Sequence, residues 1–296
     1  MEFGRISIAE IDQVDFTLPT DPSMNSTILP GESSGRFRFN LGMDSWGRTE
    51  WVGIIYPPKI QQKDFLSYYG QHFNAIELNS THYKIYAETY IQKWKEQVNN
   101  SNFIFCPKMY KGVTHFGSLR GKEELTTNFL KGISSFNEQL GPVFVQLSDS
   151  FSPTRIGELK DFLTSLPTHI TFFLELRHPH WFINESIFHL LRELNIGAVI
   201  TDSPGRRDCV HMHLTVPKLF VRFVANDRHP TYTERIIDWA KRIKFWQSKG
   251  LEEVNFFIHA QDELVILEVV KNAIETFNEV CNAGLKPLKL SDQSLF

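Results

Sequence analysis

Short apolar runs of strand length recur along the chain and alternate with segments of helical periodicity. Because strands covered by helices on both sides are apolar along their whole length, this alternation predicts a parallel sheet surrounded by helices. Eight strands over about 250 residues match the size of a TIM barrel. We therefore expect an α/β protein with a TIM (β/α)8 barrel. The expected strands are 36–43, 75–79, 103–109, 142–148, 171–177, 197–203, 219–226 and 253–260.

Helical periodicity fills most of the gaps between these strands. The segment after the sixth strand, 204–218, is the exception, because it contains Pro204 and Pro217 and is short for a covering helix. We expect this one helical unit to be irregular or short. A doubly wound open sheet is the alternative, but no G-x-G-x-x-G follows any strand. The helical stripes run through 63–73, 89–98, 125–140, 156–166, 187–194, 233–246 and 267–277.

Residues 1–35 differ from the rest of the chain. They are polar, contain three prolines and show no helical or strand periodicity. Such a segment is typical of an arm that is poorly ordered or lies along the surface. We therefore expect two parts, the arm at 1–35 and a single barrel domain at 36–296. We also expect residues 1–30 to be dispensable for the barrel core.

The composition restricts the function classes. The chain has 31 Lys and Arg against 34 Asp and Glu, so no global basic field suggests nucleic acid as a ligand. The three cysteines are scattered and show no C-x-x-C spacing, which favours a reducing cytoplasm over an oxidising compartment. No run of about 18 apolar residues occurs, so we expect no membrane partner. The sequence leaves the oligomeric state open.

Polar residues gather at the ends of the expected strands. In "FFLELRHPHWF" (172–182), Glu175 and Arg177 share one face of an apolar strand, and burying such charges is expensive unless they are paired or used. The mouth at the carboxyl ends of the strands is where TIM barrels hold their reacting groups. The sequence therefore predicts a ligand site there; the alternative is an ion network that only fixes the strands. Other strand ends carry Asp44, Glu77, Asn79, Lys108, Gln146, Asp202, Arg222 and His259.

Several stretches resemble the YecE-like family, which contains the domain of unknown function 72. The similarity includes "LGMDSWGRTEWVGIIYPP" (41–58), "FNAIELNSTHYK" (73–84), "LELRHPHWF" (174–182) and "FFIHAQDE" (256–263), in the family's order. It covers nearly everything after residue 36. The resemblance implies a TIM barrel, and it implies no particular reaction. The family also resembles, at the level of fold alone, the class of barrels that contains endonuclease IV and xylose isomerase. Those barrels bind metals at the mouth.

Residue chemistry gives each candidate a role. Glu77 and Glu175 are the candidate catalytic residues, because general acid–base work needs carboxylates with a tuned pKa. Lys108, Arg177 and Arg222 could bind a phosphate or carboxylate, and a desolvated Lys108 could also form a Schiff base, which we favour less. The further candidates for substrate binding are Trp46, Asn79, Tyr83, Gln146, His178, Asp202 and His259.

Three hypotheses for function remain at this stage. The first is an enzyme, a hydrolase, lyase or isomerase, that acts on a small phosphorylated or carboxylated substrate by acid–base chemistry. The second is a nucleic-acid-binding or processing protein that resembles endonuclease IV and stacks bases on loop aromatics. The third is a ligand-binding protein without catalysis. We predict no cofactor and no metal, because cations stand among the ligands; a divalent metal on Glu175, His178, Asp202 and His259 is the minor alternative.

Overall fold

The computed structural model describes residues 4, 6–29, 31, 37–226 and 228–290. Within these residues all eight expected strands are confirmed, and neighbouring strands run parallel. Six of them form one sheet in the order β1-β8-β7-β6-β5-β4, and β2 pairs with β3 in a second sheet. The strands are β1 (Arg38–Met43), β2 (Ala75–Leu78), β3 (Ile104–Pro107), β4 (Val143–Gln146), β5 (Phe172–Glu175), β6 (Gly197–Asp202), β7 (Lys218–Val224) and β8 (Glu253–His259).

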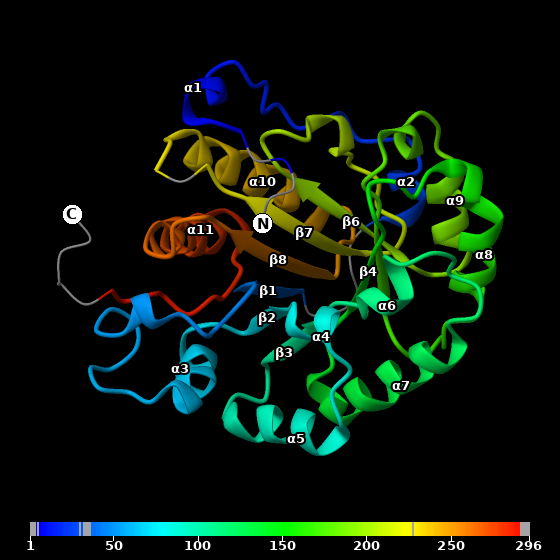
Figure 1. The fold of residues 1–296 in the computed structure, drawn as a ribbon. Coiled ribbons are helices and arrows are strands. Elements are labelled where there is room, and N and C mark those ends of the chain that lie inside the picture. The colour runs from blue at the N-terminus through cyan, green and yellow to red at the C-terminus, as the bar shows by residue number, and fades with distance from the viewer. Residues whose placement is uncertain (1–3, 5, 30, 32–36, 227, 291–296) are drawn as a thin grey trace.

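The longer helices lie around the outside of the strands (Figure 1). In the described chain, the only helical element between β6 and β7 is the 3-10 turn η6 (Arg207–Cys209), which confirms the irregular unit. No helix of the described ranges combines the length and apolarity needed to cross a membrane. The longer helices are α3 (Phe65–His72), α5 (Glu88–Gln97), α7 (Glu123–Ile133), α8 (Ile156–Thr164), α9 (Ser186–Glu193), α10 (Thr231–Gln247) and α11 (Val265–Cys281).

Helix α9 shows how the sequence sets such a helix. Ile187, Phe188 and Leu191 fall on one side of it and are buried against the strands. Asn195 follows the end of the helix in the left-handed conformation, with φ 55°. Asparagine tolerates this conformation better than most residues, so the chain can turn directly into β6.

The two sheets meet at places where ladder hydrogen bonds are few. Between β1 and β2, the side chain of Asn74 donates to the Phe39 carbonyl (2.8 Å) and accepts from the Leu41 amide (2.9 Å). Between β3 and β4, the contact is through isolated bridges such as Lys108 to Phe144. The fold is therefore an α/β fold with a six-stranded and a two-stranded parallel sheet, and the expected eight-stranded barrel is met only in part by the strand pairing.

A separate apolar cluster fills the space between the inner faces of the strands. Its aromatic members are linked through Phe220, whose ring centroid lies 5.3 Å from that of Phe144 and 5.1 Å from that of Phe257. Strands β2 to β8 each supply one residue, so the inner face is defined strand by strand. The cluster comprises Ala75, Cys106, Phe144, Phe173, Val199, Val216, Phe220 and Phe257.

The described part of the N-terminal arm lies against the helical side of the protein, with α1 (Ile8–Ile11) near α10 and α2 (Asn25–Ile28) beside α9 (Figure 1). Asp21 accepts a hydrogen bond from Trp246 Nε1 (2.8 Å) and pairs with Arg242. Asn25 bonds the loop before β7 through Met212 and Leu214. The described residues of the arm therefore make specific contacts with α10 and with the loop before β7. Residues 1–3, 5, 30 and 32–36 of the arm lie outside the described residues.

Candidate functional site

Arg222 on β7 is the centre of the polar layer above the apolar cluster. Its side chain is 2% exposed. Its Nε and Nη2 atoms donate to the two carboxylate oxygens of Glu77 at 2.9 and 2.8 Å. Its Nη1 donates to both oxygens of Glu175, at 2.9 and 3.1 Å. One guanidinium thus joins β2, β5 and β7 at the carboxyl ends of the strands. Because alternate residues of a strand share one face, the sequence already predicts that Glu77, Glu175 and Arg222 lie on the inner face.

Burial and charge act in opposite directions on the two glutamates. Burial alone would raise both pKa values. Arg222 and His259 together outweigh this effect and hold the pKa of Glu77 well below its ordinary value. Arg222 together with Arg177 lowers the pKa of Glu175 to about 2. Both carboxylates are therefore ionised at neutral pH.

His259 on β8 extends the network on the side of β1. Its Nε2 donates to Glu77 Oε2 at 3.0 Å, and its Nδ1 lies 3.5 Å from Asp44 Oδ2. Burial opposes a charged imidazole, but Glu77 and Asp44 outweigh it and raise the pKa of His259. Asn79 donates to the other Glu77 oxygen at 2.8 Å. Glu77 is thereby held from three directions.

Glu175 is held in the same way on the side of β4. Gln146 Nε2 donates to one carboxylate oxygen at 2.7 Å, and Arg177 Nε donates to the other at 3.0 Å. The Arg177 side chain is 14% exposed, and its Nη1 lies 3.9 Å from Asp149. Arg177 is consequently closer to solvent than Arg222 and lies at the open side of the network.

Lys108 directly follows β3 and reaches the same layer. Its Nζ lies 5.8 Å from the centroid of the Phe144 ring. The Arg222 guanidinium lies 5.4 Å from the same ring centroid. Burial and the neighbouring Arg222 lower the pKa of Lys108 to about 7. Among the described residues Lys108 forms no ion pair, because the two glutamates bind Arg222 and Arg177 instead.

Asp202 is the candidate that the structure places elsewhere. It lies on the outer face of β6, where it pairs with Arg235 (2.9 Å) and Arg207 and accepts from Trp239 Nε1 (2.8 Å). The residue before it, Thr201, lies on the same face of β6 as Val199, which belongs to the inner cluster. Thr201 Oγ1 is buried without a hydrogen-bond partner in the described chain. Strand parity could have identified Thr201, but its hydroxyl is a weaker sequence signal than a carboxylate.

Three further candidates lie outside the ion network. Trp46 packs its ring 5.5 Å from that of Trp94 on α5. Tyr83 is 65% exposed and carries the Lys111 ammonium 4.9 Å from its ring centroid. His178 accepts a hydrogen bond from the His180 amide through Nδ1 and thereby begins the turn after β5. Trp46 therefore packs against α5, and Tyr83 is open to solvent.

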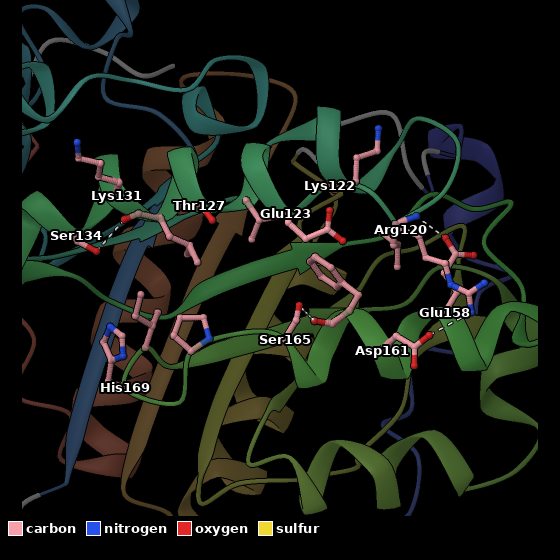
Figure 2. Close-up of a pocket in the computed structure, with 16 residues that line it drawn as sticks. Arg120, Lys122, Glu123, Thr127, Lys131, Ser134, Glu158, Asp161, Ser165 and His169 are labelled. Atoms are coloured by element: carbon pink, nitrogen blue, oxygen red, sulfur yellow. Dashed lines mark hydrogen bonds and ion pairs between the residues drawn. The ribbon is translucent and has the colours of Figure 1, made fainter.

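A hollow of about 510 Å³ lies between α7 and α8, and it contains none of the candidate residues (Figure 2). Its lining residues include the apolar side chains of Leu130, Phe162 and Ile170, and also exposed charges such as Arg120 and Asp161. None of the ionisable residues that line this hollow is buried. The network of Glu77, Glu175, Arg177, Arg222 and His259 at the carboxyl ends of the strands, here called the mouth network, is therefore the better candidate site.

The described residues contain no group of three or more His, Cys, Asp and Glu side chains arranged to hold a metal ion. At the mouth, Glu77, Glu175 and His259 are each occupied by guanidinium or carboxylate partners, and three cations stand among them. The absence of a bound metal or cofactor stays a prediction from the sequence.

Comparison with known proteins defines the family. The profile of the family described as "Protein of unknown function DUF72" matches residues 40–285. The chain therefore belongs to the DUF72 family, as its motifs predict. It is similar to the UPF0759 protein YecE of Escherichia coli K12, with 26% identity over 86% of this chain and 99% of that protein. It is also 30% identical to the UPF0759 protein YunF of Bacillus subtilis 168, over 32% of this chain and 34% of that one.

Solved structures support the fold alone. A DUF72 family protein from Enterococcus faecalis V583 superposes with a TM-score of 0.63 at 20% identity, over 83% of this chain and 98% of that one. A DUF72 family protein from Thermotoga maritima MSB8 gives a TM-score of 0.62 at 21% identity, over 83% and 99%. Neither likeness assigns an activity.

Proposed function

We propose that this protein is an enzyme that binds a small phosphorylated or carboxylated substrate at the mouth formed by the carboxyl ends of its strands. The observation that carries the proposal is the arrangement of cations there. Arg222 pairs with two carboxylates. Lys108, beside Arg177, forms no ion pair among the described residues. Positive charge at the carboxyl ends of the strands suits an anionic ligand.

The roles of the glutamates follow from their pKa values. Glu77 and Glu175 have lowered pKa values, so both carboxylates are weak bases at neutral pH. We propose that they hold Arg222 and Arg177 in place and orient the ligand. Lys108, with a pKa of about 7, is the group suited to exchange a proton with the substrate at neutral pH.

We further propose that the eight strands act as one closed TIM barrel. Tyr69 supports this closure, because its hydroxyl accepts from the Met43 amide (2.8 Å) and donates to the Ala75 carbonyl (3.0 Å), joining β1 to β2. Between β3 and β4, the Met109 amide donates to the Phe144 carbonyl at 2.9 Å. A closed barrel would bring all the mouth residues to one end of the molecule. We place the protein in the cytoplasm, on the sequence argument given above.

Thermal melting in the presence of anions tests the proposed binding. Phosphate or sulfate should raise the melting temperature, by an amount equivalent to about 2.7 kcal/mol at a hundredfold excess over the dissociation constant. Arg177→Lys should remove most of this gain, because an ammonium lacks the bidentate fork. Both anions also stabilise proteins non-specifically by exclusion from the surface. Arg120→Lys, at an exposed pair with Asp161, is therefore the matched control and should keep the full response.

The measurement is a melting curve at constant ionic strength in phosphate, sulfate, sugar phosphates and chloride. If wild type responds no more than Arg177→Lys does, the anion proposal is wrong, and the network only fixes the strands.

A second candidate function, binding of single-stranded nucleic acid, is favoured by one observation. Tyr83 and Phe116 are 65% and 59% exposed, and Lys111 lies over the Tyr83 ring. Exposed aromatics beside lysines can stack bases and contact phosphates. Binding of a fluorescent oligonucleotide should then fall steeply with salt and weaken in Tyr83→Ala. No binding at low salt would eliminate this candidate.

A further inference from the structure

We propose that Lys108 is a nucleophile that forms a covalent imine with an aldehyde or ketone group of the ligand. The inference rests on the proposed function, because it assigns the substrate class and the chemistry of the same mouth. The ligand would then be a small carbonyl compound that also carries a carboxylate or phosphate.

The first support is the way the protein places Lys108. Its backbone is fixed on both sides: the amide donates to the Leu78 carbonyl (3.2 Å), and the carbonyl accepts from Thr81 Oγ1 (2.9 Å). The residue is 8% exposed, so a small part of it reaches solvent from a buried position. This fixed backbone and the burial of the residue place the Lys108 side chain in the polar layer, with its amine near the Phe144 ring.

The second support is the absence of a counter-ion. A lysine that served only to neutralise Glu77 and Glu175 would bind them directly. Instead, both carboxylates bind guanidinium groups, and in the part of the chain that the structure describes the Lys108 amine is left with the Phe144 ring. Lysines that form imines are commonly desolvated and placed next to another cation, because both effects favour the neutral amine.

The groups that face Lys108 agree with this role. Arg222 and Arg177 disfavour its protonated form, whereas Glu175 and Glu77 favour it, and burial decides the balance. Two imidazoles interact electrostatically with Lys108, His82 in α4 (Ser80–Tyr83) and His115 directly after α6 (Lys111–Thr114). Burial lowers the pKa of His82 to about 3 and of His115 to about 4. Both imidazoles are therefore neutral at physiological pH and place no positive charge beside the amine.

The proposed step balances without an oxidant or reductant. The neutral amine of Lys108 attacks the carbonyl carbon and forms a C–N bond. The nitrogen then loses two protons, which leave with the carbonyl oxygen as one water molecule, and a C=N bond remains. The imine withdraws electrons from the adjacent carbon, which suits proton abstraction or carbon–carbon cleavage there.

Reductive trapping tests the proposal with two probes of equal length. Glyoxylate carries an aldehyde and a carboxylate, and glycolaldehyde carries an aldehyde and a neutral hydroxyl. Sodium cyanoborohydride delivers hydride to the imine carbon and makes the adduct permanent. Peptide mass spectrometry then locates it and separates Lys108 from the terminal amine, which also reacts near pH 8.

We expect wild type at pH 7.5 to be labelled by glyoxylate on Lys108 at least about tenfold faster than on Lys111, because desolvation and the neighbouring cation favour the neutral amine of Lys108. Lys111 lies three residues after Lys108, over the Tyr83 ring. Lys111→Met should keep the Lys108 adduct, and Lys108→Arg should lose the mouth adduct. The primary result comes from wild type, so it does not depend on the folding of either variant.

No adduct on Lys108, or an adduct that forms no faster there than on Lys111, would overturn the inference. If phosphate stabilises the protein but Lys108 stays unlabelled, the inference fails and the anion site stands. If glycolaldehyde labels Lys108 as fast as glyoxylate does and no anion stabilises the protein, the imine stands and the anion site fails.

Discussion

Arg222 places a full charge at the centre of the protein, above a layer of phenylalanine rings. Removing a guanidinium and two carboxylates from water carries a penalty of several kcal/mol per ion, and close hydrogen-bonded geometry is needed to offset it. Arg222 meets that requirement with four hydrogen bonds between 2.8 and 3.1 Å to Glu77 and Glu175. The network is therefore stable only when it is complete.

Arg222→Met should lower the free energy of unfolding by about 3–5 kcal/mol, because it leaves two buried carboxylates without their shared cation. Urea denaturation followed by circular dichroism measures the change. Arg120→Met is the control, since Arg120 and Asp161 are 69% and 65% exposed and such pairs contribute at most about 1 kcal/mol. Equal losses in the two variants would show that the buried network does not stabilise the fold.

Lys108 should make stability depend on pH in the alkaline range. Its pKa is about 7 in the folded protein and 10.5 ordinarily, so between these values the unfolded chain binds a proton that the folded protein does not. Stability then rises with pH across this window. The free energy of unfolding of wild type, measured relative to Lys108→Met, should increase from pH 7 to pH 9. A flat or falling difference would mean that Lys108 is charged in the folded state.

The sequence predicts most of the polar layer but not all of it. Glu77, Glu175 and Arg222 follow from strand parity alone, because alternate residues share a face. Asp202 shows the limit: its burial depends on Arg235 and Trp239 of α10, more than thirty positions away, and no local pattern reveals such partners. The pairing of Arg222 with two glutamates, rather than with a ligand, is likewise a property of the assembled fold.

At the level of elements, strands and helices are predictable because their signal is local. All eight apolar runs became strands, and the short connection with Pro204 and Pro217 became a loop with one 3-10 turn. The junctions between the two sheets could not be predicted. They depend on single side chains outside the strands, Asn74 and Tyr69, and on the close approach of Gly42 to the Ala75 carbonyl, where any side chain would collide.

The N-terminal arm is expected to contribute to stability, contrary to its polar, aperiodic sequence. Asp21→Ala should cost about 1–3 kcal/mol, because Trp246 Nε1 and Arg242 lose their acceptor. Asp12→Ala is the matched control, since the Asp12 side chain is 81% exposed in its contact with His229. Deletion of residues 1–29 should lower the melting temperature further. An unchanged melting temperature after deletion would instead support the prediction from the sequence that residues 1–30 are dispensable.

At the scale of the whole molecule, the apolar cluster and the polar layer divide the interior of the strands into two levels. The packed phenylalanine rings lie directly against Arg222, so the charged side chains cannot move toward them when a partner is lost. Charges that are fixed in this way need no rearrangement when a ligand arrives. This pre-organisation is what an anion site requires for affinity.

The central claim, an anion site at the mouth, is tested most directly by equilibrium dialysis of radioactive inorganic phosphate against wild type, Arg177→Met, Lys108→Met and Arg120→Met. We predict saturable binding by wild type and by Arg120→Met, and loss of at least about tenfold in affinity in each mouth variant, since hydrogen bonds to charged groups contribute about 1.5–3 kcal/mol. Binding that does not saturate, or that is equal in all four proteins, would contradict the account.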